Sequence, residues 1–301
     1  MSKIAFVFPG QGSQYVGMGK DLFVNSKDIM EAANDELGFS LTNIMFNGPV
    51  DSLKQTDITQ PAIFLHSVAL FQKIKSIKPD MVAGHSLGEY SALVAAGAID
   101  LIDALKLVRT RGQAMLQAGI EQSGTMAAII GLKPLRVEEI CEEASTSGIV
   151  QCANFNSPGQ IVISGSVGGV KAAMILAKES GAKLVKELVV SGAFHSPLMA
   201  SAKEKLQTKL DETKIINVSV PVYANVTAKV VTNSDEIKKL LYDQLSSPVR
   251  WEESIMNMIE DGATEFIEIG PGSVLQGLVK RINKEVKVSG IEKLEDLDKY
   301  I

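Results

Sequence analysis

Cysteine and long apolar stretches are scarce in this chain, and each scarcity excludes a class of protein. The only cysteines in 301 residues are Cys141 and Cys152, and neither belongs to a CxxC spacing. We therefore expect no disulfide framework and no metal site. No window approaches roughly 18 uninterrupted apolar residues, so no membrane-spanning segment is expected. The apolar run near the start ends too early, at Pro9, for a secretory signal, and the expected location is the cytoplasm.

An excess of basic charge is also missing. The chain has 30 Lys and Arg against 35 Asp and Glu, a net charge of −5, so a nucleic-acid-binding face is not expected. Hydrophobic residues at 46% and charged residues at 22% are typical of a globular protein. The length allows one large domain with an insertion, or two domains.

Strands alternate with helices over the first part of the chain. Short apolar runs at residues 4–8 and 80–84 predict buried parallel strands, and residues 221–225 and 264–269 predict two more. Helices are expected after residues 60–61, with Pro61 in the first turn, and over residues 87–97 and 101–118, the last with Asp100 as its N-cap. This alternation predicts an α/β fold with a doubly wound parallel sheet.

The rhythm changes from residue 124. The expected order is a strand at 126–130, a helix at 137–144, strands at 149–153 and 160–164, a helix at 167–180 and a strand at 183–190. This β-α-β-β-α-β order is typical of a ferredoxin-like unit. We therefore predict a ferredoxin-like subdomain over residues 124–192, inserted into a catalytic domain made of residues 1–123 and 193–301.

A nucleophile motif lies where an expected strand meets an expected helix. Residues 84–88 read GHSLG, a GxSxG pattern in which the glycines permit a tight turn around Ser86. The helix N-terminus that follows favours a developing oxyanion. In this context a nucleophilic Ser86 is favoured over a chance turn.

A serine nucleophile needs a base, and only three histidines are available. His85 adjoins the serine and is expected to point away, as a packing residue. His66 lies within the helix after Pro61, where a packed or exposed role is favoured. His195 follows the predicted insertion in a loop that re-enters the main domain, and it is the preferred base.

One arginine lies on the apolar side of its helix. The inward stripe of residues 101–118 includes Val108, Arg111 and Met115, and no acidic residue stands three or four positions from Arg111. A buried guanidinium needs an anion. A structural salt bridge and a bidentate clamp on a substrate carboxylate both remain open. The glycine-rich residues 9–14 fit no nucleotide-binding motif, and close approach to another loop, with the Gln11 N–H donated to an oxyanion, suits them better.

Five separated segments resemble the markers of one family, the malonyl-CoA:acyl carrier protein transacylases. They occur in the family's order over nearly the whole chain: residues 8–14 (FPGQGSQ), 84–92 (GHSLGEYSA), 109–112 (RTRG), 154–160 (NFNSPGQ) and 268–272 (EIGPG). The resemblance implies an α/β-hydrolase-like domain with a ferredoxin-like insert. It also implies malonyl-CoA and acyl carrier protein as partners, with the coenzyme A thioester as substrate and no bound cofactor.

The same resemblance assigns roles to individual residues. Ser86 matches the acylated nucleophile, His195 its base and Arg111 the partner of the malonyl carboxylate. Gln11 and Leu87 match the backbone donors of the oxyanion hole. Gln244 matches the segment that orients the histidine, where an uncharged oxygen replaces the carboxylate of a Ser-His-Asp triad. Phe194 matches a position that accompanies malonyl rather than methylmalonyl selection.

Three other functions are compatible with parts of the pattern. A hydrolase of esters or thioesters would share Ser86 and His195 but would need an acidic third member and a water-accessible acyl-enzyme. A non-catalytic carrier-docking module would not need these residues, and a separate acyltransferase serving a polyketide synthase would differ only in its carrier. An acidic carrier needs a basic patch, for which the candidates are Lys183 with Lys186 and Lys280-Arg281 with Lys284, although plain solvated faces are favoured at both places.

Overall fold

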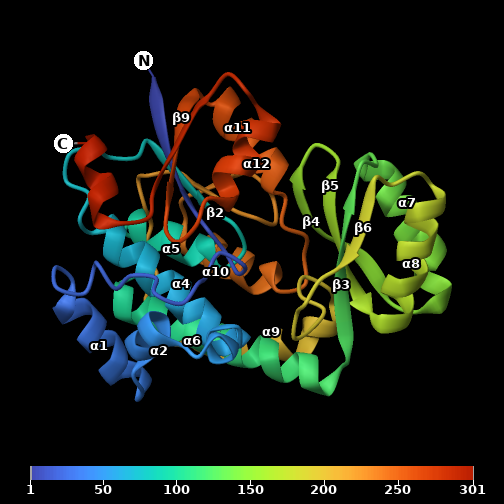
Figure 1. Cartoon of the computed structure of the whole chain (residues 1–301), viewed down its shortest axis with the longest axis horizontal. Helices are drawn as coiled ribbons and strands as arrows, with labels where there is room; N and C mark the ends of the chain where they lie inside the picture. Colours follow the sequence, from blue (N-terminus) through green and yellow to red (C-terminus); the bar gives the residue numbers. More distant parts are fainter. Residues whose placement is uncertain (1, 301) are drawn as a thin grey trace.

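Two β-sheets organise the chain in the computed structural model, which describes residues 2–300 (Figure 1). The larger sheet has the strand order β10-β9-β1-β2-β7-β8, and its neighbours are parallel except for the β7–β8 pair. Its strands are β1 (Lys3–Phe8), β2 (Met81–Gly84), β7 (Val222–Tyr223), β8 (Val230–Val231), β9 (Ala263–Ile269) and β10 (Lys287–Ile291). The predicted α/β class with a parallel sheet is confirmed.

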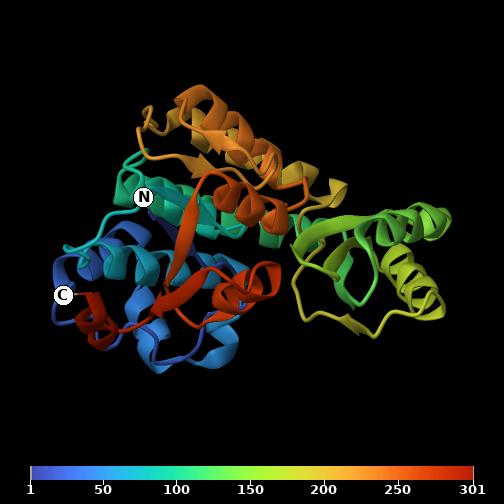
Figure 2. The same cartoon turned by 90° about the horizontal axis from the view of Figure 1, so that it is seen from above.

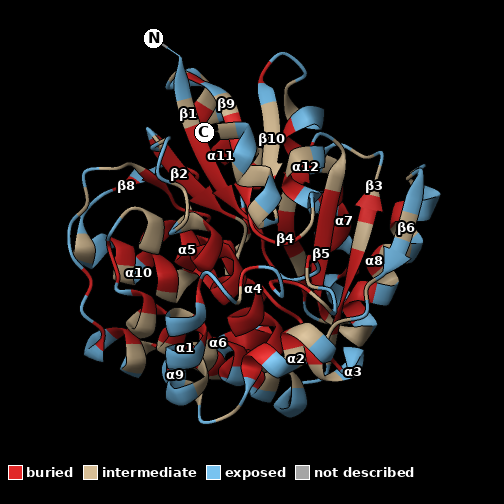
Figure 3. Cartoon of the chain, turned by 60° about the vertical axis from the view of Figure 1, so that its left-hand side comes forward, coloured by how far each residue is buried: buried red, intermediate tan, exposed pale blue. Residues whose placement is uncertain are grey.

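Helices cover both faces of this sheet. Along β1, Phe6 and Phe8 join one apolar cluster while Ala5 and Val7 join another, because successive side chains of a strand point to opposite faces. Residues 5–8 of the strand are therefore buried on both sides, within the buried core that Figure 3 colours red. The first face is covered by α1 (Lys27–Leu37), α2 (Leu41–Asn47), α3 (Val50–Leu53), α4 (Thr56–Phe71), α5 (Gly88–Ala95), α6 (Leu101–Glu121), α9 (Ala200–Glu212) and α10 (Ser234–Gln244).

The second face is covered by α11 (Trp251–Glu260) and α12 (Val274–Ile282). Short 3₁₀ helices lie at η2 (Pro197–Met199) and η3 (Leu294–Tyr300). The side chain of Asp100 accepts from the Ile102 amide at 2.9 Å, so the predicted N-cap of α6 is confirmed. Among residues 2–300, no helix combines the length and the hydropathy that crossing a membrane requires.

The larger sheet and its covering helices form the larger unit of the molecule. The smaller sheet is antiparallel, and with its own helices it forms a smaller unit at one side of the larger one (Figure 2). Its order β4-β5-β3-β6 and the helices packed on it form the predicted β-α-β-β-α-β unit. The elements are β3 (Gly124–Ile130), α7 (Pro134–Ala144), η1 (Ser145–Ser147), β4 (Val150–Ser157), β5 (Gln160–Ser166), α8 (Val167–Glu179) and β6 (Leu184–Glu187). The division of the chain at residues 124 and 192 stays a prediction.

The two faces of the smaller sheet have different neighbours. Ala127 and Ile129 of β3 pack into the unit's own core, whereas Met126 and, on β5, Val162 join the cluster of the larger unit. The backbone of β4 also bonds to the larger unit, since the Phe155 amide donates to the Val249 carbonyl at 2.9 Å. One face of the smaller sheet therefore packs directly against the larger unit.

The start of α4 corrects one expectation. The helix begins at Thr56, so Pro61 lies inside it rather than in its first turn. Proline has no N–H to donate to the Asp57 carbonyl one turn earlier. The Arg109 guanidinium of α6 donates to that carbonyl instead, and it also pairs with the Asp57 carboxylate at 2.9 Å. A hydrogen bond from a distant arginine thus replaces the one that proline removes.

Several strands differ in length from the prediction, and two of these differences bear on the site. β4 runs on to Ser157, through a bulge that brings Asn154 and Asn156 to the site described below. β6 ends at Glu187 instead of continuing to residue 190, and Leu188 and Val190 line the same site. Both differences supply residues to the wall of the same cavity.

Candidate active site

Ser86 lies in the sharp turn between β2 and α5 that the GxSxG pattern predicts. Its φ of 51° falls in the left-handed region, which is costly for a residue with a Cβ. A Cβ on Gly84 would lie 1.9 Å from the Gly88 carbonyl carbon, and one on Gly88 would lie 2.0 Å from the Phe8 carbonyl oxygen. Only glycine fits at either position, so the two glycines allow the turn that presents Ser86.

A second residue holds this turn from the neighbouring strand. Asn225, fully buried just beyond β7, accepts a hydrogen bond from the Ser86 amide at 2.7 Å and donates to the Gly84 carbonyl at 2.7 Å. It satisfies two backbone groups that the tight turn leaves without regular partners. The sequence pattern placed Asn225 only at the end of a strand and carried no signal of this contact.

The structure brings His195 to the serine. Its Nε2 lies 2.8 Å from the Ser86 Oγ, and its Nδ1 lies 2.8 Å from the backbone carbonyl oxygen of Gln244. That carbonyl can only accept, so Nδ1 carries the proton and Nε2 is free to accept one from the serine. Burial, followed by the nearby Arg111 charge, lowers the pKa of His195 to about 3 and keeps the ring neutral.

The other two histidines do not serve as the base. His85 packs edge-on against Trp251 and its Nε2 is 2.8 Å from the Asn156 Oδ1, so it supports the wall of the site. His66 is fully buried in α4, and neither ring nitrogen has a hydrogen-bond partner among residues 2–300. Burial lowers the pKa of His66 to about 4, which keeps it neutral. Neither contacts the Ser86 hydroxyl.

Arg111 is buried, 1% exposed, and reaches the nucleophile. Its guanidinium donates to the Ser86 Oγ at 3.0 Å, to the Gln60 Oε1 at 2.7 Å and to the Gln244 Oε1 at 2.9 Å. Within residues 2–300 it makes no ion pair with a carboxylate. The hypothesis that Arg111 forms a structural salt bridge is therefore wrong. The guanidinium is held by neutral oxygens and faces the reacting serine, as a clamp for an anionic substrate group would be. Gln60 was not recognised from the sequence.

Gln244 contributes through both its backbone and its side chain. Besides the carbonyl that accepts from His195, its side-chain Oε1 faces Arg111 while its Nε2 donates to the Ser86 carbonyl at 3.1 Å and to the Glu89 Oε2 at 2.7 Å. Burial raises the pKa of Glu89 to about 7. The family resemblance placed Gln244 beside the histidine, but no sequence pattern identified Glu89.

Gln11 and Leu87 flank the serine. A Cβ on Gly10 would lie 2.4 Å from the His85 carbonyl oxygen, so glycine there lets the 9–14 loop approach the turn closely. Both residues line the same cavity as Ser86, and Leu87 is the N-cap of α5. Among residues 2–300 neither backbone amide donates a hydrogen bond to the protein. Their role as oxyanion donors stays a prediction.

A cavity of about 290 Å³ opens above Ser86 between the two units. Phe194, 6% exposed, stands in its wall beside His195. The smaller unit contributes Met126, Asn154, Asn156, Gln160 and Val162, and α12 contributes Val274, Leu275 and Leu278. Part of the predicted basic patch borders it, since Arg281 donates to the Gln160 Oε1 at 2.6 Å. Of the ligand types His, Cys, Asp and Glu, no three side chains within residues 2–300 gather as a metal site.

Comparison with known proteins places this geometry in a family. A family model described as "Acyl transferase domain" matches residues 5–298. The malonyl CoA-acyl carrier protein transacylase of Bacillus subtilis (strain 168) is 48% identical, over 99% of this chain and 96% of that protein. The protein of the same name from Staphylococcus aureus (strain COL) is 44% identical, over 99% and 98%.

Solved structures agree with the sequence relatives. An acyl carrier protein S-malonyltransferase from Vibrio cholerae superposes with a TM-score of 0.96 at 43% identity, with both chains covered completely. A malonyl-transacylase solved in complex with its type II PKS acyl-carrier protein superposes with a TM-score of 0.95 at 40% identity, over 99% of each chain. The likeness therefore extends across both sheets and the cavity between them.

Proposed function

The chain belongs to the malonyl-CoA–acyl carrier protein transacylase family, and from this premise we propose how its own residues move the acyl group. The protein transfers malonyl from malonyl-CoA to the phosphopantetheine thiol of acyl carrier protein through a malonyl–Ser86 ester. The observation that carries this route is the Ser86 hydroxyl, which lies 2.8 Å from the His195 Nε2 and 3.0 Å from Arg111.

The first half of the reaction forms the acyl-enzyme. His195 accepts the Ser86 proton as Oγ attacks the thioester carbonyl carbon, and the Gln11 and Leu87 amides donate to the oxyanion that develops. The tetrahedral intermediate then breaks its C–S bond, and the His195 proton goes to the departing coenzyme A thiolate. The Gln244 carbonyl holds the imidazole in one tautomer throughout.

The second half reverses these steps with a different thiol. His195 takes the proton of the phosphopantetheine thiol as its sulfur attacks the malonyl–Ser86 ester, and the same amides hold the oxyanion. The C–O bond to Ser86 then breaks and the serine regains its proton from His195.

Arg111 supplies the acyl selectivity in this proposal. A malonyl group carries a carboxylate that pairs with the guanidinium, whereas an acetyl group leaves the buried charge without an anion. Phe194, in the cavity wall, limits the room beside the acyl chain and so disfavours a methyl branch.

The relatives also bear on the alternatives. Their names describe transacylases, so neither a hydrolase nor a non-catalytic docking module is favoured. We propose that the acceptor is the carrier protein of fatty acid synthesis. The alternative acceptor is the carrier protein of a type II polyketide synthase, and a comparison of the two carriers distinguishes them. We further propose that the enzyme is cytoplasmic, which its two free cysteines support. We also propose that it needs no bound cofactor.

Intact-mass analysis tests the proposal. Wild-type protein mixed with malonyl-CoA should gain one malonyl group and lose it when phosphopantetheinylated carrier protein is added, while Ser86→Ala should gain none. An adduct lost to water equally fast with or without carrier would establish a hydrolase instead. Carriers from fatty acid and polyketide synthesis, compared by the rate of transfer, identify the acceptor.

A further inference from the structure

Glu89 is a buried carboxylate that the proposed reaction does not use. It lies on α5, one helical turn beyond the nucleophile, and is only 2% exposed. A carboxylate in such a place is costly unless its oxygens are hydrogen-bonded. Its partners therefore indicate what the residue is for.

One oxygen of Glu89 joins two residues that support the nucleophile. Its Oε2 accepts from the Gln244 side-chain amide at 2.7 Å and from the Asn225 backbone amide at 3.0 Å. Asn225 holds the backbone on both sides of the turn, and Gln244 contacts both the Ser86 carbonyl and Arg111. Glu89 thus lies behind the site and touches neither the reacting hydroxyl nor the cavity.

The Gln244 amide has only one favourable orientation in these surroundings. Its Nε2 faces two acceptors, Glu89 and the Ser86 carbonyl, and its Oε1 faces the Arg111 guanidinium, which has only donors. Turned over, the amide would point N–H groups at the guanidinium and an oxygen at the carboxylate. Glu89 is the acceptor that disfavours this turn.

The same amide links Arg111 to Glu89. Arg111 has no carboxylate partner within residues 2–300, but Gln244 accepts from it with one end and donates to Glu89 with the other. Hydrogen bonds in such a chain polarise each other, so the bond that Nε2 donates to Glu89 makes Oε1 a better acceptor for the guanidinium.

We propose that Glu89 is a positioning residue for acyl selectivity, which fixes the Gln244 amide so that Arg111 is held ready for the malonyl carboxylate. This role rests on the proposed malonyl transfer. It affects malonyl more than acetyl, because only malonyl brings a carboxylate to the guanidinium, while the backbone carbonyl of Gln244 orients His195 for both.

The test compares Ser86 acylation by malonyl-CoA and by acetyl-CoA in variants of the full chain. Glu89→Met keeps the length of the side chain but accepts no hydrogen bond, and we expect it to lower the malonyl-to-acetyl ratio of kcat/KM about tenfold, the value of one charge-assisted hydrogen bond. Glu89→Gln retains an acceptor oxygen and should restore the ratio to within about twofold of wild type.

A double-mutant cycle shows whether Glu89 acts through Gln244. Gln244→Met should also lower the ratio about tenfold, and the double variant should be no worse than either single variant, because both changes remove one linkage. A product of about a hundredfold would mean independent effects and would overturn the proposal. An unchanged ratio in Glu89→Met would overturn it as well.

A second buried carboxylate provides the matched control. Glu268 is 1% exposed and accepts from the Leu275 and Gln276 amides at 3.1 Å, but it contacts neither Arg111 nor Gln244. Glu268→Met should keep the wild-type malonyl-to-acetyl ratio. If Glu268→Met lowered this ratio as much as Glu89→Met does, the effect of Glu89 would be explained by general destabilisation, and the proposal would be overturned.

Two further measurements separate the remaining outcomes. If Glu89→Met does not fold, Glu89→Asp withdraws the carboxylate by one methylene and should lower the ratio about threefold, whereas an unchanged ratio overturns the proposal. If wild-type protein takes up no malonyl group, the proposed function fails. With wild type active, only the role of Glu89 is in question.

Discussion

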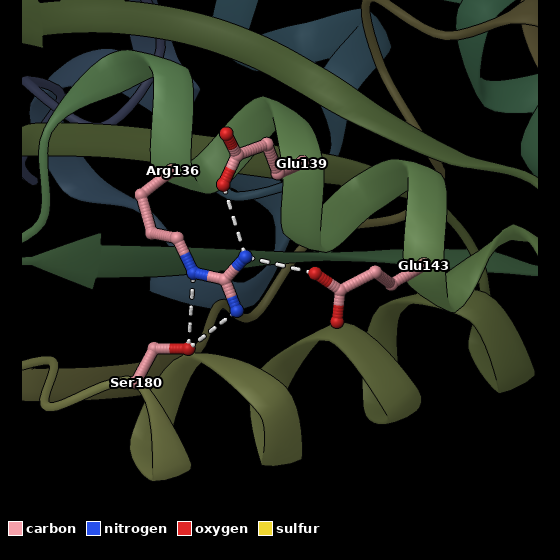
Figure 4. Close-up of polar contacts among 4 residues, drawn as sticks. All are labelled: Arg136, Glu139, Glu143 and Ser180. Atoms are coloured by element: carbon pink, nitrogen blue, oxygen red, sulfur yellow. Dashed lines mark hydrogen bonds and ion pairs between the residues drawn. The ribbon is translucent and has the colours of Figure 1, made fainter.

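Two arginines show how differently the two units of the molecule use the same side chain. In the smaller unit, Arg136 of α7 pairs with Glu139 at 3.0 Å and Glu143 at 2.8 Å, and donates to the Ser180 hydroxyl at 3.0 Å beyond α8 (Figure 4). Its side chain is 38% exposed. In the larger unit, Arg111 is 1% exposed and has neutral oxygens as its partners.

The difference separates stability from function. Arg136 has two carboxylates in water, where such pairs contribute little because solvent screens the charges. Arg111 has lost its hydration and has gained no carboxylate among residues 2–300, an arrangement that folding alone does not favour. A charge buried at that cost beside a nucleophile is explained by the anion that it binds during the reaction.

The largest expected effect comes from removing the nucleophile or its base. Ser86→Ala should abolish acyl transfer, a loss of at least about 10⁴-fold, and His195→Ala should cost about 10³-fold, because the hydroxyl then keeps its proton. Single-turnover acylation by malonyl-CoA measures both. Activity within tenfold of wild type in either variant would mean that the reaction does not take place at Ser86 and His195. The functional role of the buried Arg111, in contrast to the exposed Arg136, would then be lost.

The next effect concerns the buried arginine itself. Arg111→Ala should lower the malonyl preference over acetyl about a hundredfold, since a lost buried charge pair costs about 3 kcal/mol. Arg111→Lys keeps the charge but loses the two-pronged geometry, and should recover part of the preference. The ratio of kcat/KM for the two thioesters gives the answer, and an unchanged ratio in Arg111→Ala would mean that another group binds the carboxylate.

A smaller loss is expected at the residue that holds the turn. Asn225→Ala leaves the Ser86 amide and the Gly84 carbonyl without their partners and should lower kcat about tenfold, with a stability cost of about 1–3 kcal/mol. Asn225→Asp keeps the acceptor for the Ser86 amide, so its kcat and its stability should lie between those of wild type and Asn225→Ala. Steady-state kinetics with thermal unfolding measure both quantities, and a loss confined to KM would argue against a role in placing the hydroxyl.

These residues also show how far the sequence predicts the site. Ser86 could be predicted because a tight turn needs glycine at fixed spacing, and Arg111 because helical periodicity places it inward. His195 was the preferred base among only three histidines. Each of these signals is local, or depends on a rare residue type.

Asn225, Gln60 and Glu89 could not be found in this way. Asn225 meets Ser86 across 139 residues of sequence, and common amide and carboxyl side chains carry no pattern that predicts such a contact. The position of Pro61 was predicted wrongly for a related reason. The local rule places proline in the first turn, but a tertiary hydrogen bond from Arg109 to the Asp57 carbonyl overrides it.

The pH dependence of acylation tests the environment of His195. Burial and Arg111 lower the pKa of His195 to about 3. The ring should therefore stay neutral, and able to accept a proton, at pH values well below 6.5, the ordinary pKa of histidine. A lowered pKa moves the acidic limb of kcat/KM to lower pH, so the rate should change less than about threefold between about pH 5.5 and 7.5. A fall centred near pH 6.5 would mean that His195 is more hydrated than its buried position indicates.

The smallest effect should come from the exposed arginine. Arg136→Ala removes both ion pairs and the bond to Ser180, yet its partners remain in water, and Tm should fall by less than about 2 °C. Because surface pairs are screened, added salt should reduce even this difference. Transfer kinetics should stay at the wild-type level, since Arg136 contacts α7 and the end of α8 but not the cavity. A large loss of activity in Arg136→Ala would show that the α7–α8 packing sets the position of the cavity wall, and the separation between the two arginines would then fail.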